Sequence, residues 1–233
     1  MNILPLFERS GPTLRVDDVH KSYRRGGQTF GALAGITCDV APGQLTVLMG
    51  PSGCGKTTLL NILGGVDRAD TGRIWVGGAE ITRHSDDLQL SRHRLTEVGF
   101  VFQAFNLIPG LTAIDNLQLP MAARGVSKAS RTERARALLD LVGLRSKQDK
   151  RPDQLSGGEQ QRVAIGLALA NDAPTILADE PTGSLDSENG RRVTELLRDL
   201  AVRVGKTVLV ATHDEMVAAL GHRRLTMRDG RLL

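Results

Sequence analysis

The segment from Gly50 to Thr57, G-P-S-G-C-G-K-T, has the residue types and the spacing of a phosphate-binding loop. It matches G-x-x-x-x-G-K-[ST] in full, and it lies between a strand-like apolar stretch, residues 45–50, and a helix-like run, residues 57–63. Backbone N–H groups of such a loop surround phosphate oxygens, while Lys56 is expected to reach the outer phosphates and the Thr57 hydroxyl to bind Mg²⁺. The expected phosphate-binding residues are Gly50, Pro51, Ser52, Gly53, Cys54, Gly55, Lys56, Thr57 and Thr58.

Two carboxylates stand at the end of the apolar segment T-I-L-A-D, residues 175–179. In a phosphate-loop fold this strand lies beside the strand that feeds the loop, so Asp179 is expected to hold Mg²⁺ and Glu180 to point at the γ-phosphate. A carboxylate there can take a proton from the attacking water, an effect of roughly 10²–10⁴-fold. Such an acidic pair is also common at the start of a helix, but the presence of the phosphate-binding loop in the same chain favours the catalytic interpretation.

A third segment, L-S-G-G-E-Q-Q-R at residues 155–162, contains two adjacent glycines before an apolar helical run. Ser156 and Glu159 have the spacing of a capping box, which accounts for a helix start but not for Gly157 and Gly158. Glycine permits close approach to the backbone, and a helix N-terminus suits a phosphate. The segment therefore reads as an anion site that has no base, nucleophile or metal ligand of its own.

Short apolar strands alternate with helical segments along the chain, which indicates an α/β fold with a parallel sheet. Short strands are expected over residues 13–48, a hairpin over 72–82 and a strand over 98–102. Residues 111–170 read as helical and charged, with loops at Pro120, Gly125 and Pro152. We expect a single domain over residues 1–233.

The composition excludes several classes of protein. Of the 233 residues, 40% are hydrophobic and 24% charged, and no apolar run approaches the length of a membrane helix. Neither a signal peptide nor a C-x-x-C motif is present, which favours a reducing compartment. Basic residues cluster at 91–94, 131–136, 145–151 and 222–224; solvated helix faces are favoured over nucleic-acid contacts, because aromatic residues are only 3% of the chain.

Together these segments resemble the ATP-binding subunit of ABC transporters, from about residue 14 to residue 233, with residues 155–162 similar to the family's signature motif. The resemblance implies a P-loop NTPase core with a mostly parallel sheet, an antiparallel β-subdomain and a helical subdomain at about 105–170. It further implies that two copies dimerise head to tail, each ATP lying between one copy's loop and the other copy's signature. Ser156, Gly157, Gly158 and Glu159 would then complete a neighbour's site.

Other positions match the family one by one. Gln103 is similar to the glutamine near Mg²⁺ and the attacking water, and His213 to the switch histidine that senses the γ-phosphate. Asp186 belongs to a segment that is similar to the loop that crosses the dimer interface. Tyr23 is similar to the aromatic residue that stacks on adenine. The chain departs from the family at Leu167, where an arginine is common, and at Ser184, where asparagine is frequent.

Residues 102–120, together with E-P-T-G-S-L-D, are similar to the branch that serves lipoprotein-releasing, macrolide-efflux and cell-division permeases. The resemblance implies a peripheral ATPase on the cytoplasmic face of the membrane. Its partners would be a second ATP-binding subunit, expected to be identical, and a separate membrane permease, with no direct nucleic-acid contact. Alternatives are a mechanotransmission ATPase whose partner moves no cargo, and a soluble ABC ATPase that acts on nucleic acid or ribosomes. A small-molecule kinase would not need residues 155–162.

Overall fold

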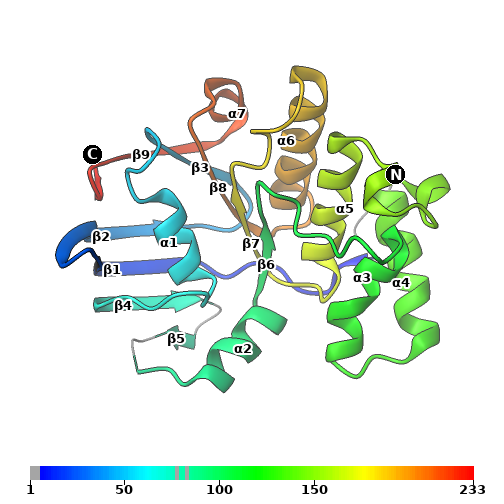
Figure 1. Ribbon diagram of the computed structural model, residues 1–233, viewed down its shortest axis with the longest axis horizontal. Coiled ribbons are helices and arrows are strands. Elements are labelled where there is room, and N and C mark those ends of the chain that lie inside the picture. Colours follow the sequence, from blue (N-terminus) through cyan, green and yellow to red (C-terminus); the bar gives the residue numbers. More distant parts are fainter. Residues whose placement is uncertain (1–5, 77–78, 82–83) are drawn as a thin grey trace.

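The computed structural model describes residues 6–76, 79–81 and 84–233. Two sheets and a group of helices make up the molecule. In Figure 1 a four-stranded sheet lies at the left, a six-stranded sheet crosses the middle, and helices α3 (Ala113–Ala123), α4 (Lys128–Leu141) and α5 (Gly157–Leu169) lie at the right. The α/β class, the mostly parallel sheet, the antiparallel sheet and the separate helices expected from the sequence are confirmed.

The six-stranded sheet forms the centre of the molecule, and every neighbouring pair from β9 (Arg223–Arg228) to β6 (Val98–Val101) runs parallel. Buried on both faces, its central strands are continuously apolar, as parallel strands usually are. Alternate residues face two hydrophobic cores: Leu177 and Leu209 face one that includes helix α1 (Lys56–Leu63), whereas Ile176 and Val208 face the other. In spatial order the strands are β10 (Arg231–Leu232), β9 (Arg223–Arg228), β3 (Leu45–Met49), β8 (Thr207–Thr212), β7 (Thr175–Asp179) and β6 (Val98–Val101). The expectation that β7 lies beside β3 is wrong, because β8 pairs with both and separates them.

The four-stranded sheet is antiparallel and contains two strands much longer than the sequence indicated. Its strands, in spatial order, are β2 (Gln28–Val40), β1 (Leu14–Arg25), β4 (Thr71–Val76) and β5 (Ala79–Ile81). The hairpin expected over 72–82 is present as the β4–β5 pair, with Ile74 opposite Ile81. Residues 77, 78 and 82 of that expectation lie outside the described residues.

The loop expected at Pro120 is wrong, because this proline lies inside α3. A proline in a helix removes one backbone hydrogen bond and costs about 3 kcal/mol. The cap from Thr112 and the burial of Leu117 and Met121 on either side of the proline hold the helix together nonetheless. Pro152 is not in a loop either: it opens a short 3₁₀ helix, Pro152–Gln154, where its missing N–H is tolerated.

Three further α-helices and a short 3₁₀ helix, Arg145–Lys147, complete the described part of the chain; the α-helices are α2 (Asp87–Thr96), α6 (Ser187–Val202) and α7 (Glu215–Leu220). The sequence indicated only α6. Helix α2 lacked a signal because it buries just Leu90 and His93, so that its apolar pattern is faint. Within the described ranges, no helix combines the length and the apolar character that a membrane span requires.

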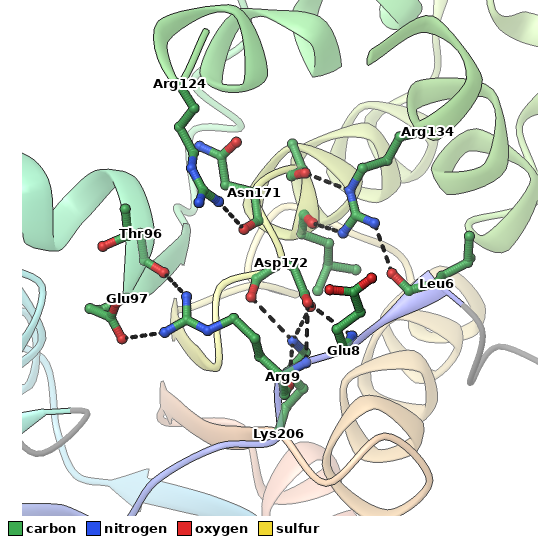
Figure 2. A network of polar contacts seen from close by, with 12 residues as sticks. Leu6, Glu8, Arg9, Thr96, Glu97, Arg124, Arg134, Asn171, Asp172 and Lys206 are labelled. Carbon is green, nitrogen blue, oxygen red and sulfur yellow. Dashed lines mark hydrogen bonds and ion pairs between the residues drawn. The ribbon is translucent and has the colours of Figure 1, made fainter. Parts of the chain in front are cut away.

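The N-terminal segment ties the helices to the central sheet through a network of polar contacts, shown in Figure 2. Lys206, which is fully buried, donates to the Asp172 carboxylate at 2.5 Å and to the Arg9 carbonyl at 3.0 Å. Asp172 also accepts from the backbone N–H groups of Glu8 and Arg9. From α4, Arg134 donates to the carbonyls of Leu6, Leu169 and Ala170, so this member of the basic clusters is not the solvated side chain expected.

Candidate functional site

A cavity of about 330 Å³ opens between the two sheets, at the carboxyl ends of β3 and β7. Two of its glycines have backbone conformations that other residues avoid, Gly53 with φ of 80° and Gly55 with φ of 109°. A side chain on Gly55 would also overlap the carbonyl oxygen of Ala32. The lining residues are Tyr23, Ala32, Ser52, Gly53, Gly55, Lys56, Thr57, Thr58, Gln103 and Glu180.

Lys56, the first residue of α1, is 6% exposed at the floor of this cavity. Its ammonium donates to the carbonyls of Gly50 at 2.7 Å and Pro51 at 3.1 Å, and it lies 3.7 Å from a Glu180 oxygen. These partners belong to the loop and to the cavity wall. An incoming phosphate can therefore share the ammonium without disturbing the hydrophobic core.

Asp179 and Thr57 form a pair that fits a divalent cation. Asp179 ends β7, and its oxygen Oδ1 is buried with no hydrogen-bond partner in the described structure. Burial raises the pKa of Asp179, while a hydrogen bond from Thr57 opposes that rise. An unpartnered carboxylate oxygen beside a hydroxyl is a donor set that suits Mg²⁺.

Glu180 lies directly after β7 in the left-handed region, with φ of 45°, which is uncommon for a residue other than glycine. Its backbone N–H donates to the carbonyl of Ala211, which holds the turn against β8. Its carboxylate accepts from the Thr212 hydroxyl at 2.9 Å and contacts Nδ1 of His213 at 2.9 Å. The carboxylate thereby faces the same cavity as Lys56.

The contact with Glu180 determines which nitrogen of His213 carries a proton. A carboxylate only accepts hydrogen bonds, so Nδ1 must be the donor. A neutral ring then has no N–H at Nε2. A neutral His213 can therefore donate to a phosphate only after its ring leaves Glu180.

Residues 155–162 lie outside the cavity, since none of them is among its lining residues. The capping box expected at Ser156 and Glu159 is present: each side chain accepts from the other's backbone N–H. The bond from the Ser156 N–H lowers the pKa of Glu159, with a smaller contribution from Lys147. Ser156 is exposed at the start of α5.

Gly158 is buried against Asn189, a residue of α6 that the sequence did not single out. A side chain on Gly158 would overlap Asn189, whose amide donates to Asp186 at 2.6 Å and accepts from Arg162 at 3.3 Å. Asn189 therefore links the start of α5 to the exposed cap of α6, Asp186. Part of the glycine requirement in residues 155–162 comes from this packing within the chain.

Two further residues in contact with expected site residues escaped the sequence interpretation. Thr212 donates a hydrogen bond to Glu180. Its place at the end of β8, directly before His213, is the sequence feature that could have identified it. Asp67 accepts from the Tyr23 hydroxyl at 2.6 Å, and no sequence pattern marks it. Of the other residues singled out in the sequence, Gln103 lines the cavity beside Gly183, Cys54 is a buried residue of the loop, and Leu167, the departure from the family, lies partly buried.

Comparison with known proteins identifies the family. The model of the ABC transporter family matches residues 33–183, which include the phosphate loop, residues 155–162 and the two carboxylates. This chain belongs to the ABC transporter family. It is an ATP-binding ATPase of that family, with the phosphate loop and the acidic pair in one cavity.

Relatives of this ABC protein include an uncharacterized ABC transporter ATP-binding protein from Thermotoga maritima, 47% identical over 92% of this chain and 91% of the relative. The macrolide export ATP-binding/permease protein MacB of Chromobacterium violaceum is 43% identical over 96% of this chain, which spans only 34% of MacB. A third relative is the ATP-binding cassette MJ0796 of Methanocaldococcus jannaschii. A solved structure of MJ0796 is 41% identical to this chain, with a TM-score of 0.87 over 94% of this chain and 96% of that chain. That structure is a dimer in a post-hydrolysis state, bound to ADP and Pi.

Proposed function

We propose that this ABC ATPase hydrolyses ATP in a composite site, in which one copy binds the phosphates and a second copy covers them head to tail. The observation that carries the proposal is that the cavity and residues 155–162 lie apart within one chain. Lys56 and Glu180 line the cavity, whereas exposed Ser156 caps a helix that does not reach it. A helix N-terminus of this kind suits a phosphate that a neighbour presents. The dimer of MJ0796 with ADP and Pi supports this arrangement.

The cavity residues would divide the chemistry among them. Backbone N–H groups of residues 50–58 and the Lys56 ammonium hold the phosphates. Glu180 takes the proton of the attacking water, and Thr212 keeps its carboxylate aimed into the cavity. Gln103, which lines the cavity, and His213, which contacts Glu180 from outside the lining, would respond to the γ-phosphate, and Tyr23 would stack on adenine.

Thr57, Asp179 and Gln103 would hold Mg²⁺ beside the phosphates, the fit resting on the unpartnered oxygen of Asp179. When bound, the ion supplies positive charge that offsets the charge developing on the phosphoryl oxygens. Asp186 and Ser156 through Glu159 would contribute from the partner copy. The exposure of Asp186 and Ser156 at the starts of α6 and α5 supports these roles.

The partner of the ATPase dimer would be a membrane permease subunit, with this protein peripheral on the cytoplasmic face. A second cavity of about 400 Å³ lies between α3 and β6, and three exposed apolar side chains line it: Val66, Ile108 and Leu119. We assign this cavity to a helix of the permease. MacB, whose name joins ATP-binding and permease functions in macrolide export, supports an export role for the pair.

The substitution Glu180→Gln tests both parts of the proposal. It keeps the size of the side chain but removes the base, so ATP should still bind while turnover falls by roughly 10²–10⁴-fold. Without hydrolysis the ATP-bound dimer should accumulate, and sedimentation velocity with and without ATP measures it.

Glu188→Gln is the matched control, because Glu188 is an exposed residue of α6 whose side chain pairs with Arg192. It should leave turnover unchanged. Wild-type turnover in the Glu180→Gln protein would remove Glu180 from the role of base. An ATP-loaded Glu180→Gln protein that stays monomeric at all concentrations would contradict the composite site.

A further inference from the structure

Tyr23 is the only tyrosine of the chain and is held by its hydroxyl. It lies near the end of β1, where 42% of the residue is exposed and its ring lines the nucleotide cavity. The hydroxyl donates to Oδ2 of Asp67 at 2.6 Å. Asp67 follows α1 in the chain, so this bond joins the antiparallel sheet to the segment behind the phosphate loop.

Asp67 is itself fixed by neighbours on its other oxygen. Oδ1 accepts from the Lys21 ammonium at 2.8 Å and from the backbone N–H of Arg68 at 2.6 Å. Lys21 is mostly buried; it also donates to the Arg68 carbonyl and lies 5.0 Å from the centre of the Tyr23 ring. The phenol therefore meets an acceptor that has little freedom to move.

The protonation states agree with this geometry. Burial alone would raise the pKa of Asp67, but the hydrogen bonds from Lys21, Tyr23 and the Arg68 N–H outweigh it, so that its pKa lies below its usual value. Partial burial and the bond to Asp67 raise the pKa of Tyr23, while a side-chain hydrogen bond with Thr58 opposes part of that rise. At neutral pH the pair is thus an ionised acceptor and a protonated donor.

We propose that Asp67 is a positioning residue for nucleotide binding, which holds the Tyr23 ring in place for the base before the nucleotide arrives. The inference rests on the proposed function, in which Tyr23 stacks on adenine. A ring that is already immobile loses less side-chain entropy on binding, and ordering such a side chain typically changes an affinity by about 3- to 10-fold. Lys21 contributes by fixing Asp67.

The experiment uses calorimetric binding of ATP and of inorganic tripolyphosphate, which has the phosphates but no base. Asp67→Ala and Tyr23→Phe should each raise the Kd of ATP by about 3- to 10-fold. In the double variant the Kd should rise no further than in Tyr23→Phe alone, because the phenylalanine already lacks the bond to Asp67 and also the hydrogen bond with Thr58. Tripolyphosphate binding should not change, and in turnover assays KM should rise while kcat stays the same.

The single tyrosine provides a spectroscopic readout. In Asp67→Ala the phenol loses both the bond that it donates to Asp67 and the nearby negative charge, so the alkaline midpoint of its ultraviolet titration should fall. If the alanine variant does not fold, Asp67→Asn keeps the side-chain volume and removes the charge. Asp87→Ala is the control, because Asp87 pairs with the neighbouring Arg68 and lies in the same region.

An unchanged ATP affinity in Asp67→Ala would overturn the proposal, as would additive losses in the double variant or an equal loss of tripolyphosphate binding. The variant Tyr23→Ala separates this failure from failure of the proposed function. If Tyr23→Ala weakens ATP binding and Asp67→Ala does not, only the positioning role is wrong. If Tyr23→Ala leaves ATP binding unchanged, the stacking role itself is wrong.

Discussion

Two buried lysines of this protein have opposite relations to their surroundings. Lys56 is held by the carbonyls of Gly50 and Pro51, six and five residues away, at the wall of a cavity. Lys206 is held by Asp172 and by the Arg9 carbonyl, 34 and 197 residues away, with no exposure to solvent. Lys56 can exchange its partners for a ligand. Lys206 joins distant parts of the chain, and losing any of its partners would break that connection.

The largest effect on stability is expected from Lys206→Met. The methionine replaces the stem but leaves the Asp172 carboxylate, which is 15% exposed, without its cation. Loss of one partner from a buried pair should reduce the free energy of unfolding by about 3 kcal/mol. Denaturation in guanidinium chloride measures the loss, and the Kd of ATP should stay within twofold of wild type.

The double variant Lys206→Met with Asp172→Asn sharpens this prediction. It removes the unpaired charge while leaving an amide that can still face the backbone N–H groups of Glu8 and Arg9. Part of the lost stability should return. A double variant less stable than the single one would mean that the carboxylate is not the source of the cost.

Lys56→Ala should show the opposite pattern. Its partners are loop carbonyls that water can reach once the side chain is gone, so the free energy of unfolding should change by less than about 1 kcal/mol. Loss of a charged donor to the phosphates should weaken ATP binding roughly 10- to 100-fold. Unaltered ATP binding would mean that Lys56 does not face the phosphates.

The smallest effect is expected from Arg9→Ala, within the same network as Lys206. Arg9 donates to the Thr96 carbonyl and to the Glu97 carboxylate, but its side chain is 39% exposed. Because solvent screens such a pair, the expected loss of unfolding free energy is only about 1 kcal/mol. A loss as large as that of Lys206→Met would remove the distinction between buried and exposed members of this network.

The sequence predicted the phosphate loop, the carboxylates after β7 and the capping box because each depends on residues close together in the chain. Gly53, Gly55 and Lys56 take their conformations from a single strand–loop–helix unit. The α/β class followed from the continuously apolar strands β3, β7 and β8. The roles of the site residues remain predictions, although Lys56, Thr57, Gln103 and Glu180 line one cavity.

Other features depend on contacts between distant residues and left no local pattern. Lys206, Asp172 and Arg9 are ordinary polar residues until the fold places them together. Asp67 meets Tyr23 across 44 residues. Pro120 misled the interpretation because its local preference against helix is overcome by burial on both sides. Sequence patterns therefore predicted the chemical groups of the loop but not the distant residues that hold the surrounding structure in place.

Asn189 touches Gly158 and bonds Asp186, so it makes the beginnings of α5 and α6 mechanically one piece. A tilt of either helix has to be transmitted to the other, since the close packing leaves no slack for independent motion. An isosteric aspartate at position 189 would insert a second negative charge beside Asp186, and the shared edge would be pushed apart. The rigid connection between the starts of α5 and α6 thus depends on the side-chain amide of Asn189.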